Sequence, residues 1–153
     1  MATPPDPRLP EPQLPARTPQ TPRTLRALDA RIDTIGRHPF RAKFHLRGRD
    51  RATAELKGPA TVRRHAYDLI AERLAPAEPY KDGRQTPYRG HPVFVAQHAT
   101  ATCCRTCLQR LHGIPKGRPL TRAEHLYVVD VILRWIEREM TGGGQQGEPG
   151  RQG

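Results

Sequence analysis

The chain has 153 residues, of which 35% are hydrophobic and 27% are charged, and this suits one hydrophobic core better than two. Its formal charge is +11, so a strongly acidic protein is excluded and anionic partners are favoured. The sequence has no apolar run of the ~18 to 20 residues that cross a bilayer and no signal peptide at its amino terminus, so we expect a cytoplasmic protein without a membrane partner.

The sequence predicts three regions. Eight of the 17 prolines precede Thr24, so residues 1–24 are expected to form a disordered Pro-rich tail. Residues 25–140 are expected to fold, and the Gly-rich residues 141–153 to form a second disordered tail. For the folded part we expect a mainly α, single compact domain of about four to five helices with long loops, with one short strand as an option.

Apolar spacing predicts two clear helices in the first half of the domain. Leu25, Leu28, Ile32 and Ile35 recur every three or four residues, and Gly36 ends this pattern. A similar stripe predicts a helix over 59–74. Residues 50–57 could form a short helix closed by Gly58, whereas the segment 38–46 has no clear pattern.

The second half begins with a predicted long loop over 76–90, which is rich in proline and basic residues. The apolar run 92–96 is too short to distinguish a buried strand from a buried helix. Thr100 and Thr102 are candidate caps for a helix over 103–112. Thr121 and Glu124 form a capping-box pattern that predicts the longest helix, ending near Met140.

Six thiol or imidazole groups fall within the 22 residues from His91 to His112. Cysteine thiolates and histidine nitrogens at such short spacings are typical ligands of zinc. The predicted ligand set is Cys104, Cys107, His112 and His98. Cys103 or His91 could complete the site instead.

Two other interpretations of the cysteines stay open. On a helical wheel Cys104, Cys107, Leu108 and Leu111 share one face, about 80 degrees from His112, which favours simple core packing. Alternatively, Cys103 or Cys104 is a nucleophile with His98 as its base, in a cysteine-dependent enzyme that acts on a small anionic substrate. In that case the loop 76–90 would be a basic lid.

The positive charge is concentrated in the domain, where residues 25–140 contain 22 Lys and Arg against 12 Asp and Glu. Nucleic acid or another phosphate-bearing ligand is therefore the expected partner. His38 and His45 flank Phe40 and Phe44, which could stack on bases, although aromatic residues four apart more often pack in a core. The candidate anion-binding residues are Arg41, Lys43, Arg63, Arg84, Arg89 and Lys116.

Several long motifs of the chain resemble a known family. They are HPFRAKFHL at 38–46, QTPYRGHPVF at 85–94, HATATCC at 98–104 and HGIPKG at 112–117. Together they resemble a family of small bacterial and phage proteins, domain of unknown function 4186, over roughly residues 25–140. The resemblance implies one domain with these boundaries and no particular activity, substrate or catalytic residue.

The hypothesis favoured by the sequence is therefore a small basic protein that associates with nucleic acid and has a Cys/His zinc site. The cysteine-dependent enzyme is the alternative. A plain interaction module, with the Pro-rich tail as its docking ligand, is a third interpretation.

Overall fold

Six α-helices and a short π-helical turn make up residues 20–143, the part of the chain described by the computed structural model. Five of the helices have seven residues or more, and no strand occurs within 20–143. The predicted mainly α, single-domain class is confirmed. Residues 1–19 and 144–153, which contain most of both predicted tails, lie outside the described residues.

The helix α1 (Pro22–Gly36) starts three residues before the predicted position, with Thr21 as its cap. The side chain of Thr21 accepts a hydrogen bond from the backbone N–H of Thr24, which satisfies a free donor of the first turn. The carboxylate of Asp29 in α1 accepts two hydrogen bonds from the guanidinium of Arg134, at 2.7 and 2.9 Å. This ion pair fastens α1 to the long carboxyl-terminal helix.

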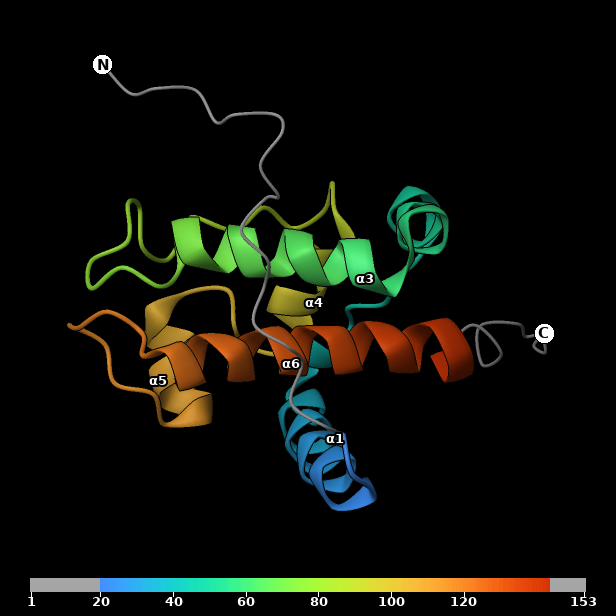
Figure 1. Cartoon of the computed structure of the whole chain (residues 1–153), viewed down its shortest axis with the longest axis horizontal. Helices are drawn as coiled ribbons and strands as arrows, with labels where there is room; N and C mark the ends of the chain where they lie inside the picture. Colours follow the sequence, from blue (N-terminus) through green and yellow to red (C-terminus); the bar gives the residue numbers. More distant parts are fainter. Residues whose placement is uncertain (1–19, 144–153) are drawn as a thin grey trace, which may run out of the picture.

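The segment 38–46, which the sequence left undecided, contains the short helix α2 (Pro39–Ala42). The helix α3 (Gly48–Arg73) then combines the two predicted helices on either side of Gly58. Gly58 has a φ of 81°, a left-handed value that favours glycine, and the helix kinks there. Figure 1 shows the part before this kink almost end-on, while the remainder of α3 runs across the view.

The short helix α4 (Pro92–Ala99) lies between α3 and the long helix α6 (Arg122–Arg138), as Figure 1 shows. The suggested strand over 92–96 is therefore wrong. All residues of α4 except Phe94 are buried. A helix that is apolar on every side has no stripe, which explains why the sequence pattern was ambiguous.

Side chains form hydrogen bonds with the free backbone groups at both ends of α6. Thr121 and Glu124 form the predicted capping box at its start, and Arg118 adds a bidentate pair to Glu124 at 2.8 Å. At the other end Arg51 donates to the carbonyls of Glu139 and Met140, so a cation meets the negative end of the helix dipole. None of the described helices is long and apolar enough to cross a membrane.

The helix α5 (Arg105–His112) begins with a fully buried arginine. Arg105 donates to five backbone carbonyls on two separate connections, those of Leu74, Ala75, Pro76, Pro115 and Arg118. Its backbone N–H also donates to Asp82 at 3.1 Å. One side chain thus joins the loop 76–90 to the connection between α5 and α6.

Candidate metal centre

The three cysteines converge where α5 begins. Their Sγ atoms all lie within 4.8 Å of one another, with Cys103 and Cys104 buried and Cys107 half-buried. Cys104 is the helix cap, since its sulfur accepts from the backbone N–H of Cys107 at 3.4 Å. The predicted caps Thr100 and Thr102 are wrong, because Thr100 instead ends α4.

A guanidinium reaches this cluster from α2. Arg41 donates to the sulfur of Cys107 at 3.1 Å and lies 3.6 Å from that of Cys103. It also donates to the backbone carbonyl of His98 at 2.7 Å. Arg41 thereby joins α2, the end of α4 and the start of α5 around the three sulfurs.

The sulfurs differ in their affinity for protons. The pKa of Cys107 is lowered, because Cys103 and Cys104 donate hydrogen bonds to it and Arg41 adds positive charge nearby. The pKa of Cys103 is raised, since its neighbouring sulfurs favour its protonated form and burial opposes its charge. The arrangement as it stands therefore favours a thiolate at Cys107.

His98 has only 7% of its surface exposed, and its backbone carbonyl accepts from Arg41, but its ring is not one of the groups whose ligand atoms all lie within 4.8 Å of one another. Its Nε2 is 3.0 Å from the carbonyl of Thr86, and this carbonyl can only accept, so Nε2 carries the ring proton. Nδ1 is then an unprotonated acceptor, and it is buried without a hydrogen-bond partner. Burial also lowers the pKa of the imidazole, which keeps the ring neutral.

Thr86 connects this histidine to the cysteines. Its hydroxyl donates to the carbonyl of Cys103 at 2.8 Å, while its own carbonyl accepts from His98. Thr86 is not predictable from the sequence, because no local pattern marks it. Its position inside the predicted long loop was the only available signal.

The other two histidines of the motif are held elsewhere. His112 contacts the hydroxyl of Tyr127 at 2.8 Å through Nδ1 and the carbonyl of Thr100 at 2.7 Å through Nε2. The Nε2 of His91 contacts His65 at 3.0 Å, and its Nδ1 accepts from the N–H of Val93. Both nitrogens of each ring are therefore occupied. Like His98, neither ring belongs to the cysteine group, so the occupied nitrogens are what distinguish these two histidines from His98.

The candidate anion-binding residues do not form one group. Arg41 lies on the sulfurs, while Lys43 lies over the rings of Phe40 and Phe44. Arg63 is half-buried on α3, and Lys116 donates to Thr106 at 2.7 Å beside α5. The two remaining candidates, Arg84 and Arg89, are exposed in the loop 76–90.

Comparison with known proteins agrees with the motifs of the sequence. The model of the family described as Domain of unknown function (DUF4186) matches residues 29–137, which include Arg41, Thr86, His98 and all three cysteines. No solved structure matches the chain. Since the family model spans well over half of its length, the chain belongs to the DUF4186 family.

Proposed function

We propose that the protein binds a zinc ion through Cys103, Cys104 and Cys107, with His98 as the fourth ligand, and that this metal-centred domain associates with nucleic acid. Relative to the ligand set expected from the sequence, Cys103 replaces His112. The zinc site is supported chiefly by the convergence of three cysteine sulfurs within 4.8 Å of one another.

The spacing of the sulfurs fits a tetrahedral ion. Zinc–sulfur bonds of about 2.3 Å place two thiolates of a tetrahedral site about 3.8 Å apart. The three Sγ atoms satisfy this with shifts of no more than about an ångström, which small side-chain rotations supply. Four protein ligands would close the site, as is typical of structural zinc rather than catalytic zinc.

The charges also support a metal. Three thiolates repel one another. Arg41 favours the thiolate at both Cys103 and Cys107, but the pKa of Cys103 is raised overall and only that of Cys107 is lowered. A divalent cation would favour all three thiolates, leaving a net charge of minus one. The guanidinium of Arg41 would neutralise that remaining charge, in the role of a residue that hydrogen-bonds to metal ligands.

His98 is the fourth ligand that the hydrogen bonds support best. Histidines that bind zinc usually donate their other N–H to a carbonyl or carboxylate, as His98 does to Thr86. The buried, unpartnered Nδ1 is then the free ligand atom, and the ring would have to shift toward the sulfurs to bind the same ion, because it lies outside their group. His112 is less suitable, since binding an ion would break its contact with either Tyr127 or Thr100.

The direct test is the metal content of protein purified without a histidine tag. We expect about one zinc per chain by elemental analysis, and well under a tenth of that in the variants Cys103→Ser and Cys107→Ser. The pair His98→Gln and His112→Gln serves as a matched comparison. His98→Gln is expected to weaken zinc binding at least about tenfold, whereas His112→Gln retains it.

Two results would count against this assignment. Metal-free wild-type protein that folds normally and takes up no added zinc would refute the site. Loss of zinc in His112→Gln but not in His98→Gln would keep the site and replace the fourth ligand. Cobalt uptake by folded variants, followed by visible absorption, separates loss of a ligand from loss of the fold.

The association with nucleic acid is supported by charge. Residues 25–140 contain ten more basic than acidic side chains, and that region includes the helices α2 to α6 and most of α1. Basic groups on a folded surface bind phosphates by releasing counterions, so binding should weaken steeply with salt.

The cysteine-dependent enzyme remains a second candidate because Cys107 is half-buried, faces Arg41 and has a lowered pKa. In this form the nucleophile is Cys107 rather than Cys103 or Cys104. Iodoacetamide distinguishes the two functions. Metal-free protein should be alkylated first at Cys107, and an enzyme would keep that reactivity as purified, whereas a zinc site would suppress it until a chelator is added.

A further inference from the structure

We propose that the surface formed by residues 37–49 with Tyr88 and Arg89, the basic aromatic face, binds single-stranded nucleic acid by stacking bases on Phe40 and Tyr88. This inference rests on the proposed association with nucleic acid and names the surface and the form of the strand. The face adjoins the candidate metal centre, because Arg41 donates to two of the sulfurs and the ring of Tyr88 stacks on that of His98 at 4.3 Å.

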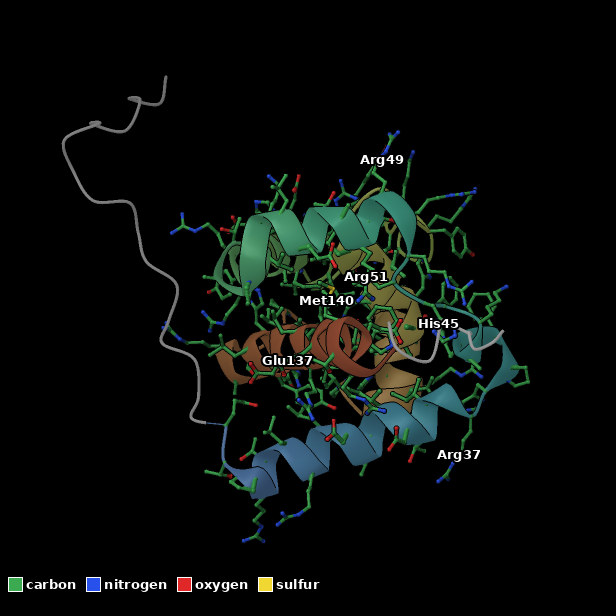
Figure 2. The ribbon with its side chains drawn as sticks, turned by 90° about the vertical axis from the view of Figure 1, so that its right-hand side faces the viewer. Arg37, His45, Arg49, Arg51, Glu137 and Met140 are labelled. Carbon is green, nitrogen blue, oxygen red and sulfur yellow. The ribbon has the colours of Figure 1, made fainter. Side chains whose placement is uncertain are left out.

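The charge of this face has one sign. Residues 37–49 contain five Lys or Arg and two His, with no Asp or Glu in thirteen positions. Most of these side chains are exposed, namely those of Arg37, His38, Lys43, His45, Arg47 and Arg49. In Figure 2 Arg37 and Arg49 point away from the ribbon at opposite edges of the view, and His45 lies between them.

Three aromatic rings form a row on the same face. The rings of Phe40 and Phe44 are 5.3 Å apart in edge contact, and Phe44 is 6.2 Å from Tyr88 in a parallel arrangement. The two outer members are solvent-accessible, since Phe40 is 41% and Tyr88 60% exposed. The core packing expected for Phe40 and Phe44 therefore holds only for Phe44, which packs against the core.

Cations accompany the exposed rings. The ammonium of Lys43 lies 4.4 Å from the centre of the Phe40 ring and 5.6 Å from that of Phe44. The backbone N–H of Gly90 donates to the carboxylate of Asp50 at 3.3 Å, so the chain next to Arg89 is held at the first turn of α3. Basic side chains thus accompany both outer rings, Lys43 at Phe40 and Arg89 as the sequence neighbour of Tyr88.

The combination favours unpaired bases over a duplex. Exposed aromatic faces within a basic surface are how proteins bind single strands without reading their sequence. In a duplex the bases are already stacked on one another, so Phe40 and Tyr88 would gain little there. Two carboxylates, those of Asp50 and Glu139, contact this face. Each accepts a hydrogen bond from a backbone N–H, of Gly90 and Leu46 respectively, which reduces its repulsion of phosphate.

The experiment measures anisotropy of a fluorescent oligothymidylate of about 20 nucleotides, long enough to cover the face, with zinc-loaded full-length protein. We expect binding that weakens as salt rises, and weaker binding to a duplex of the same length. Absence of binding at low salt would remove the association with nucleic acid altogether. Equal or tighter binding to the duplex would keep the association and overturn the stacking surface.

Variants then test the face itself. Phe40→Ala is expected to weaken binding about 5- to 100-fold, and Phe40→Leu nearly as much, since leucine keeps the apolar volume but has no ring face. Tyr80→Ala is the matched control, because Tyr80 is an exposed aromatic outside the row. Equal binding by Phe40→Ala and wild-type protein would overturn the surface while leaving the proposed association intact.

The phosphate contacts have a separate signature. The double change Arg47→Gln and Arg49→Gln should reduce the salt slope by roughly 1.4, for two lost contacts to a single strand. Changing Arg23 and Arg26 to Gln removes the same charge at the opposite end of α1 from α2 and should alter the slope little. An equal decrease of the salt slope in the two double variants would show that binding depends on net charge alone, and would overturn this surface. Zinc content and melting temperature confirm that each variant is folded.

Discussion

Replacing Arg105 with methionine is expected to lower the free energy of unfolding by roughly 3–5 kcal/mol. The side chain is fully buried, and its guanidinium serves five carbonyls on two connections. Methionine fills much of the volume but leaves those acceptors without donors in the interior. Urea unfolding followed by circular dichroism measures the change.

Two further variants show whether the loss comes from these bonds. Arg110→Met, at an exposed position of the same helix, should change stability by no more than about 0.5 kcal/mol. Arg105→Lys should be almost as damaging as Arg105→Met, because one ammonium cannot reach both connections. Wild-type stability of Arg105→Met would mean that water replaces the guanidinium, contrary to its described role.

Removing zinc is expected to lower the melting temperature by roughly 15 °C or more. An ion present at a thousand times its dissociation constant stabilises the folded state by about 4 kcal/mol. The proposed ligands come from the end of α4 and the start of α5, so the ion would hold together two short helices. Thermal unfolding with and without a strong chelator measures this contribution.

The control for the chelator is the variant Cys107→Ser. It should melt at a lower temperature than zinc-loaded wild-type protein, and the chelator should not shift it further. Identical melting of wild-type protein with and without the chelator, after confirmed removal of the ion, would assign the three sulfurs to core packing instead.

Much of the fold could be predicted because most of its helices have one buried face and one solvent-exposed face. The stripe of Leu28, Ile32 and Ile35 marks α1, and the capping box at Thr121 marks α6. The helix α4 could not be distinguished from a strand, since burial on all sides removes the periodic signal. The role of Arg105 could not be predicted either, because its partners are backbone carbonyls that no residue type reveals.

The site was found only in part for a similar reason. Spacing along the chain identified the cysteines, since ligands close in sequence can meet around one helix start. Spacing could not separate His98 from His112, which depends on the contacts of each ring with Thr86, Tyr127 and Thr100. It also could not place Arg41 on the sulfurs, because that contact joins residues more than sixty positions apart.

The loop 76–90 is fixed at several points along its length. Asp82 accepts from the start of α5, Thr86 bonds to both Cys103 and His98, and Gly90 donates to Asp50. These contacts tie the loop to three other parts of the domain, and the lid considered for the cysteine-dependent enzyme would have to break them to open. Ions or reagents would then reach the buried sulfurs from the side of Cys107, which is half-buried. Because Arg41 covers that sulfur, the rate of access would depend on how often Arg41 and α2 move away from it.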